Sequence, residues 1–232
     1  MNIEAIATIV TPFSEKFAIP RQAQIVNQAI GTLQFSPAYQ HPEYLNGLSA
    51  HSHYWLIWGF HQHEGKTKSQ TVRPPRLGGN TAVGVFATRS PFRPNNLGLS
   101  VVKLQHIDKK RLTLKFSGVD MLSGSPVYDI KPYIPYADCC TSATSTWAND
   151  VPTPDFSVLF LPKVLRTLQA YDADQGTQLL ALLQALLAYD ARPAYKKTQA
   201  TDTKRYATRL YTVDVAWRIN GKTVTVIDAA VG

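Results

Sequence analysis

The sequence contains few cysteines and no long apolar run. Its two cysteines, Cys139 and Cys140, are adjacent, which disfavours a disulfide between them and gives no metal-ligand spacing. No apolar run approaches the roughly 18 to 20 residues that a membrane-spanning helix requires. The segment MNIEAIATIV carries an acidic residue where a signal peptide has basic ones. We therefore expect a cytoplasmic protein with reduced thiols and no membrane partner.

Common nucleotide-binding and nucleophile motifs are also missing. No GxGxxG follows a strand to open a helix, and the glycine-containing segment VRPPRLGGN lacks the Lys and Ser/Thr of a P-loop. No Ser/His/Asp order or Cys/His pair indicates a nucleophile. The sequence therefore disfavours a doubly wound nucleotide fold.

Acidic residues are absent between Gly65 and Ile107, although seven basic residues lie there: Lys66, Lys68, Arg73, Arg76, Arg89, Arg93 and Lys103. The whole chain has 24 Lys and Arg against 16 Asp and Glu, a net charge of +8. Such an excess favours polyanionic partners such as nucleic acid. The one-signed segment is either a solvated face or an anion site, and its prolines and glycines favour the anion site.

Two histidine pairs are candidates for a metal site. His51 and His53 are two residues apart, and His61 and His63 repeat that spacing. No acidic residue or cysteine is arranged to complete a zinc site, so we expect no metal and assign the histidines to packing or hydrogen bonding. A metal-dependent hydrolase is the alternative that the pairs leave open.

The first 138 residues are typical of a β-rich domain. They contain short β-branched or aromatic runs separated by Gly, Pro, Asn and Asp, namely IEAIATIV, HYWLIWGF, TAVGVFAT, LSVVKLQHI and RLTLKFSGV. Five or more strands at this spacing indicate a small barrel or sandwich. We expect a mainly β protein whose β-rich domain, residues 1–138, is followed by a linker, residues 139–155, rich in Ser, Thr, Asp and Pro.

Residues 156–232 differ in pattern and predict a smaller α+β domain. VLFLPKVLRTLQAY and TQLLALLQALLAY have leucines at helical spacing, with Leu179, Leu183 and Leu186 on one face, and the polar turn DADQG separates them. Near the end of the sequence, large apolar residues alternate with smaller or polar ones from Tyr211 to Ile219. Asn220-Gly221 and then KTVTVIDA follow. We expect two helices and a β-hairpin with a type I′ turn at Asn-Gly.

Several short segments suit either turns or binding sites. Arg73 and Arg76 flank two prolines and can present two guanidinium groups to a phosphate or carboxylate, or simply lie on a surface turn. Tyrosines around Lys131 can stack on bases or form a barrel rim. DARPAYKK, residues 190–197, either contacts nucleic acid or solvates a helix end. Residues alone leave these alternatives open.

Taken in order and spacing, six segments resemble the TrmO family of tRNA methyltransferases, also called the YaeB or TsaA-like family: FAIPRQ, SHYWLIWGFHQ, TVRPPRLGGN, GVFATRSPFRPNNLGLS, DMLSGSPVYDIKPYIPY and DARPAYKK. The resemblance covers nearly the whole chain and is densest over residues 17–136. GVFATRSPFRPN is its most specific part.

The resemblance implies an S-adenosylmethionine-dependent enzyme with a small β-barrel methyltransferase fold, acting as a homodimer with the cofactor near the subunit interface. The implied reaction methylates N6 of N6-threonylcarbamoyladenosine at position 37 of threonine-type tRNA. The barrel is expected to bind the cofactor and the C-terminal domain to help hold tRNA. A non-catalytic RNA-binding barrel is the alternative reading.

The resemblance also implies site residues. Arg21 or Arg89 suits the cofactor carboxylate, and Asp120 suits the ribose hydroxyls. At Ser123, family members often carry an acid, so the chain departs from the pattern there. The implied cofactor contacts are Pro20, Arg21, Gln22, His61, Gln62, Arg89, Leu99, Asp120, Met121, Leu122 and Ser123.

Substrate contacts are a separate set. We expect Arg93 and Asn95 to orient the modified base, and we assign no general base, although the weakly nucleophilic N6 needs help in losing its proton. Candidates for tRNA phosphates or the substrate carboxylate are Arg73, Arg76, Lys131 and Arg192.

Overall fold

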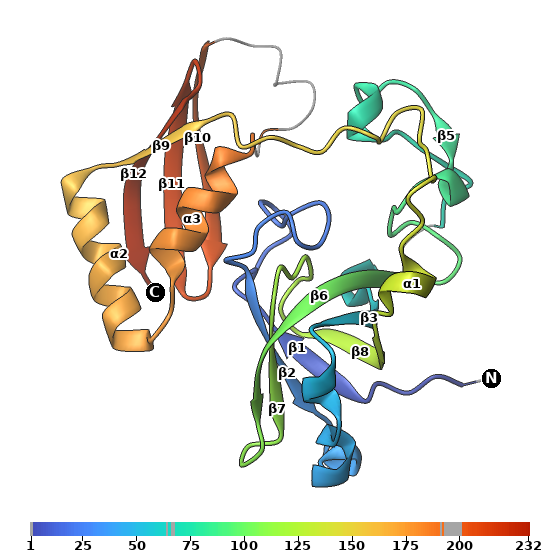
Figure 1. Ribbon diagram of the computed structural model, residues 1–232. Coiled ribbons are helices and arrows are strands. Elements are labelled where there is room, and N and C mark those ends of the chain that lie inside the picture. Colours follow the sequence, from blue (N-terminus) through green and yellow to red (C-terminus); the bar gives the residue numbers. More distant parts are fainter. Residues whose placement is uncertain (1, 64, 66–67, 191, 193–200) are drawn as a thin grey trace.

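The computed structural model describes residues 2–63, 65, 68–190, 192 and 201–232, of which 201–203 are described in backbone only. Figure 1 shows a closed barrel, and beside it a sheet with two helices. A long linker joins the two parts. The expected mainly β fold, with a barrel and a smaller α+β part, is confirmed.

The barrel has six antiparallel strands in the order β1-β2-β7-β6-β3-β8. Alternating side chains point inward, so that Ile9, Leu33, Leu56 and Leu114 are fully or almost fully buried. The strands are β1 (Ala7–Val10), β2 (Ile30–Phe35), β3 (His53–Gly59), β6 (Leu97–Asp108), β7 (Thr113–Ser117) and β8 (Ser125–Pro132). Three short 3-10 helices connect β2 to β3: η1 (Pro37–Tyr39), η2 (Pro42–Leu45) and η3 (Leu48–Ala50).

The connection from β3 to β6 is an excursion with little regular structure. It contains η4 (His61–His63), β4 (Thr71–Val72), η5 (Pro75–Leu77), β5 (Val83–Gly84) and η6 (Val85–Ala87). The expected strand in TAVGVFAT is wrong, because only Val83 and Gly84 are extended and paired, and the chain then turns into η6. Val85 alone of the η6 residues is buried, so alternation of apolar residues does not decide the structure here.

The linker begins after the short helix α1 (Pro135–Asp138). Residues 139–155, all of them described, contain neither helix nor strand. The linker passes the excursion on its way to the second part (Figure 1), where Nη1 of Arg76 donates a 2.9 Å hydrogen bond to the carbonyl of Asp150.

The second part is a four-stranded sheet in the order β10-β11-β12-β9, and its two helices cover one face (Figure 1). Leu179, Leu183 and Leu186 are buried, as their spacing predicts. Residues of the run VLF form strand β9 rather than helix, and α2 runs through Gln175 before Gly176 ends it at φ +60°. The elements are β9 (Ser157–Phe160), α2 (Pro162–Gln175), α3 (Leu179–Ala188), β10 (Thr201–Leu210), β11 (Val213–Asn220) and β12 (Thr223–Val231).

The expected C-terminal hairpin is confirmed, but its turn is not the expected one. Asn220 is the last residue of β11 and pairs with Thr223, so Gly221 and Lys222 form the turn. Gly221 has φ +57°, whereas Asn220 is not among the described residues with positive φ. A type I′ turn with Asn-Gly at its centre is therefore wrong.

Candidate functional site

A cavity of about 740 Å³ opens at the barrel between four segments: the loop after β1, the end of β3, the turn before β6 and the segment before β8. It brings together most of the residues expected to contact a cofactor. Those that line it are Pro20, Arg21, Gln22, His61, Gln62, Arg89, Leu99, Asp120 and Leu122.

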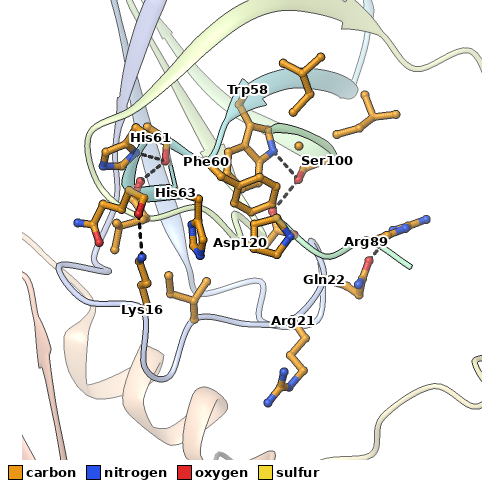
Figure 2. A pocket seen from close by; sticks show the side chains of 18 of the residues that line it. Lys16, Arg21, Gln22, Trp58, Phe60, His61, His63, Arg89, Ser100 and Asp120 are labelled. Atoms are coloured by element: carbon orange, nitrogen blue, oxygen red, sulfur yellow. Dashed lines mark hydrogen bonds between the residues drawn. The ribbon is translucent and has the colours of Figure 1, made fainter. Parts of the chain in front are cut away.

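One wall of the cavity carries a chain of three hydrogen-bonded side chains. The indole nitrogen of Trp58 donates to Oγ of Ser100 at 3.0 Å, and that hydroxyl donates to Oδ1 of Asp120 at 2.7 Å. Figure 2 shows the three together beside Phe60. Burial raises the pKa of the Asp120 carboxyl from 3.8 to about 6, and the Ser100 hydrogen bond and the Arg89 charge oppose that rise only in part. The wall therefore holds a carboxylate acceptor that is largely shielded from water.

Glycine is required where Trp58 lies on the neighbouring strand. Trp58 pairs with Gly98 across β3 and β6, and a Cβ at Gly98 would lie 2.3 Å from Cε2 of the indole. Any larger residue would displace the ring that donates to Ser100. Gly98 thus keeps the indole in place at the cavity wall.

The opposite rim is formed by the loop between β1 and β2. Gln22 accepts a hydrogen bond through Oε1 from Nη1 of Arg89, so the two polar side chains hold each other. Ala18 and Gln24 have positive φ values of 68° and 64°, a left-handed conformation that is uncommon for residues other than glycine. The backbone nitrogen of Gln24 is fixed by a 2.8 Å bond to the carbonyl of Gly118. Backbone conformations of this kind are often found at functional sites.

The third side of the cavity carries His61 and Lys16, which lie left of Asp120 in Figure 2. Nδ1 of His61 lies 3.3 Å from Oγ of Ser125, and that hydroxyl donates to the carbonyl of Leu122 at 2.8 Å. Nζ of Lys16 donates to the carbonyl of Gln62 at 3.2 Å. Among the described residues, His61 is therefore oriented by Ser125 of the barrel.

The histidine pairs do not assemble a metal site in the described part of the chain, where no group of three or more His, Cys, Asp or Glu side chains is close enough to hold an ion. Nδ1 of His53 contacts Oγ of Ser52 at 2.8 Å, and the ring of His51 packs edge-on against Tyr54. Among the same residues, no helix is both long and apolar enough to span a membrane.

Of the residues expected to contact the cofactor or the modified base, three do not line the cavity, and all three lie within the described part. Met121 is fully buried in the core, and its carbonyl accepts a hydrogen bond from Oγ1 of Thr11. Ser123 accepts from the backbone nitrogen of Thr11. The carbonyl of Asn95 accepts from the nitrogen of Leu97. Arg93 does line the cavity, and its Nη1 donates to the carbonyl of Thr88 at 2.9 Å.

The basic residues expected to contact tRNA are dispersed. Arg73 and Arg76 lie in the excursion, and Lys131 on β8 forms an exposed 3.7 Å ion pair with Asp129. Arg192 is 3% exposed and forms a 2.8 Å ion pair with Asp190, above the ring of Phe156. The other residues of the segment 191–197 lie outside the described part. A tRNA contact by Arg192 stays a prediction, and its burial speaks against it.

Sequence reasoning missed several lining residues, chief among them Lys16, Trp58, Phe60 and Ser100. Trp58 and Phe60 look like ordinary strand residues, and their rings contact each other at 4.3 Å. Only the register between β3 and β6 brings Trp58 and Ser100 to the same wall. No local pattern marks Ser100.

The cavity suits a ligand with both apolar and charged parts. Leu97, Leu99 and Leu122 with Trp58 and Phe60 offer apolar and aromatic surface, the guanidinium groups of Arg21 and Arg89 suit an anionic group, and Asp120 suits hydroxyl groups. Such a mixture of apolar lining and a few polar groups is typical of cofactor pockets.

Comparison with known proteins matches both parts of the chain to family models. The model described as "tRNA-methyltransferase O N-terminal domain" matches residues 8–139, and the one described as "TrmO C-terminal domain" matches residues 153–231.

Individual relatives match over nearly the whole chain. The tRNA (adenine(37)-N6)-methyltransferase of Escherichia coli K12 is 41% identical over 94% of this chain and 93% of its own. A putative S-adenosylmethionine-dependent methyltransferase, RcsF, of Pseudomonas aeruginosa PAO1 is 41% identical over 100% and 98%. A crystal structure of TrmO from P. aeruginosa superimposes with a TM-score of 0.84 at 35% identity and covers 99% of this chain and 97% of that one.

Proposed function

The chain belongs to the TrmO family of S-adenosylmethionine-dependent tRNA (adenine(37)-N6)-methyltransferases, and we propose that the cavity beside Asp120 binds the cofactor next to the target base. We propose as the target N6 of N6-threonylcarbamoyladenosine at position 37 of threonine-type tRNA. The observation that carries this proposal is the buried Asp120–Ser100–Trp58 chain, which faces a cavity also lined by Arg21 and Arg89.

The lining residues fit S-adenosylmethionine. When bound, this cofactor supplies an electrophilic methyl group on a sulfonium sulfur. Arg21 or Arg89 binds its carboxylate, Asp120 accepts hydrogen bonds from the ribose hydroxyls, and the apolar residues Leu97, Leu99 and Leu122 accommodate the adenine. Pro20, Gln22, His61 and Gln62 complete the contacts that line the cavity.

Substrate positioning falls to the turn before β6. Arg93 lines the cavity and suits the threonyl carboxylate or carbamoyl oxygen of the modified base. Asn95 lies two residues further along the same turn, outside the cavity lining, and is proposed to orient the edge of the base. A displacement of this kind depends mainly on alignment of the two reacting atoms, so holding the base is the main task of these side chains.

The two parts of the chain divide the work. We propose that residues 1–138 form the cofactor-binding unit and that residues 156–232, joined by the linker 139–155, help to hold tRNA. Arg73, Arg76 and Lys131 remain candidates for phosphates. Because tRNA is the substrate, we place the protein in the cytoplasm.

A homodimer is a further part of the proposal. Leu97 and Leu99 line the cavity yet are 39% and 55% exposed. Exposed apolar side chains around a cofactor site favour coverage by a second copy of the chain. Analytical ultracentrifugation tests this, and a monomer at micromolar concentration would exclude it.

The experiment that tests the function is transfer of labelled methyl from S-adenosylmethionine to tRNA purified from a strain without the enzyme. We expect label in threonylcarbamoyl-modified tRNA and none in the same tRNA that lacks the modification. A non-catalytic RNA-binding barrel predicts salt-dependent tRNA binding but no heat on mixing with the cofactor. Calorimetry with the cofactor alone separates the two functions.

A further inference from the structure

Residues 11–24 of the loop between β1 and β2 contact both parts of the molecule. Toward the second part, the carbonyl of Pro12 accepts a 2.7 Å hydrogen bond from the nitrogen of Tyr211, and Ser14 donates to the carbonyl of the same tyrosine at 2.8 Å. Phe13 forms an isolated β-bridge with Leu210 and is fully buried. Residues 12–14 thus attach the loop to the second sheet at Leu210 and Tyr211.

Phe17, three residues later, enters an aromatic stack in the second sheet. Its ring lies 5.9 Å from that of Trp217 at an interplanar angle of 10°, and 6.5 Å from that of Tyr206 at 12°. Its carbonyl accepts a 3.2 Å hydrogen bond from Oγ1 of the buried Thr208. Offset stacking of this kind adds to the free energy of simple burial, so Phe17 is anchored by both ring and backbone.

The same loop turns directly from Phe17 into the cofactor cavity. Ala18 adopts φ +68°, and Ile19, Pro20, Arg21 and Gln22 then line the cavity. Figure 2 shows Lys16, Arg21 and Gln22 along this loop. Only Ala18 therefore separates Phe17, which is anchored on the second domain, from Ile19 in the cavity wall.

We propose that Phe17 is a positioning residue for the cofactor site, and that the second domain, through Trp217 and Tyr206, fixes the loop that carries Arg21 and Gln22. The inference rests on the proposed function, since it takes S-adenosylmethionine as the ligand. It gives the second domain a role beyond tRNA contact, because cofactor affinity then depends on residues that never touch the cofactor.

Cofactor affinity should depend on Phe17 because the ring sets the fraction of molecules whose loop is in the conformation that binds the cofactor. A left-handed Ala18 is unfavourable unless its neighbours hold it. Without the Phe17 ring, the loop samples other conformations, and the apparent affinity falls by the fraction of molecules that remain competent. Residues that touch the cofactor are unchanged, so the loss comes from positioning alone.

The test is calorimetric titration of full-length Phe17→Ala with S-adenosylmethionine. We expect affinity to fall about tenfold, as for a competent fraction of roughly one in ten, while Phe17→Tyr retains the stack and binds like the wild type. Phe156→Ala is the matched control, because it removes a half-buried ring of the second domain that packs against Arg192 rather than against Phe17. We expect this variant to bind S-adenosylmethionine with unchanged affinity.

Two further measurements separate positioning from a general loss of structure. Hydrogen exchange of residues 19–22 should be faster in Phe17→Ala, with exchange in β3 and β6 unchanged. Thr208→Val removes the hydrogen bond to the carbonyl of Phe17 and keeps the shape of the side chain. We expect this variant to bind S-adenosylmethionine about threefold more weakly than the wild type. It provides the test if Phe17→Ala does not fold.

The outcomes distinguish this inference from the proposed function. Wild-type protein that binds no cofactor and transfers no methyl contradicts the proposed function itself. If the wild type binds and transfers, but folded Phe17→Ala and Thr208→Val bind equally well, the positioning role is wrong. Methyl-transfer kinetics add a check, because the role predicts a raised KM for the cofactor with an unchanged KM for tRNA.

Discussion

The hydroxyl of Ser100 donates a 2.7 Å hydrogen bond to Asp120 while it accepts a 3.0 Å bond from the indole of Trp58. This serine therefore fixes the positions of an aromatic ring and a buried carboxylate on one wall of the cavity that we propose binds the cofactor. The hydroxyl uses one acceptor position of the carboxylate and leaves other lone pairs for a ligand.

The buried Asp120 should make stability depend on pH. Its pKa is raised from 3.8 to about 6, so the stability that it contributes is fully present below pH 4 and is lost as the pH rises through 6. Asp120→Asn carries no such charge, and we expect it to be more stable than the wild type by up to about 3 kcal/mol at pH 8, with no difference due to this ionisation below pH 4. Urea unfolding at several pH values measures this.

Asp214→Asn on the exposed surface of β11 is the control for loss of one charge. A difference between Asp120→Asn and the wild type that stays constant from pH 4 to pH 8 would show that the buried carboxyl does not titrate as described. Asp120→Asn should also bind the cofactor more weakly than the wild type, since an amide offers fewer acceptors to the ribose hydroxyls than a carboxylate does.

Arg89 should be needed for cofactor affinity. Its guanidinium holds Gln22 and faces the cavity, and a charged hydrogen bond contributes about 1.5 to 3 kcal/mol. We expect Arg89→Ala to weaken S-adenosylmethionine binding about tenfold or more in calorimetry, with the fold intact. Arg111→Ala, on the exposed β6–β7 turn, should bind normally. Unchanged affinity in Arg89→Ala would remove this residue from the site.

Gly98 should tolerate no side chain. A Cβ there would lie 2.3 Å from the Trp58 ring, so Gly98→Ala must shift the indole and break its bond to Ser100. We expect a loss of about 1 to 3 kcal/mol in the free energy of unfolding, together with weaker cofactor binding. Gly84→Ala is the control, because its Cβ would meet no described atom within 4 Å and its φ is −56°. Equal stability of the two variants would contradict the packing described.

Replacement of Arg192 should lower the stability of the second domain rather than affect tRNA binding directly. It forms a buried ion pair with Asp190, and removing one partner of such a pair costs about 3 to 5 kcal/mol. We expect Arg192→Ala to destabilise the second domain in thermal unfolding, whereas Arg166→Ala on the exposed face of α2 does not. A variant of normal stability that binds tRNA poorly would instead support the phosphate contact expected from sequence.

Several strands could be predicted from the sequence, and so could ten of the 22 residues that line the cavity. HYWLIWGF and LSVVKLQHI predicted β3 and β6 because they are short runs rich in β-branched and aromatic residues. The resemblance to a known family supplied Arg21, Arg89 and Asp120. None of this required three-dimensional structure, since both signals are local in the chain.

What could not be predicted depends on contacts between distant segments. Ser100 joins the site only through the register of β3 against β6, which local sequence does not encode. Val85 to Ala87 appeared to continue a strand, but the chain has no partner strand there among the described residues and forms η6 instead. No local pattern marks Phe17, because its stacking partner Trp217 lies 200 residues further along the chain.

The most direct test of the central claim is mass spectrometry of nucleosides from tRNA after reaction with the purified protein and S-adenosylmethionine carrying a deuterated methyl group. The account predicts that threonylcarbamoyladenosine from threonine-type tRNA gains one labelled methyl, which fragmentation places on the base nitrogen. No labelled nucleoside, or label confined to another nucleoside, in a sample shown by calorimetry to bind the cofactor would contradict it.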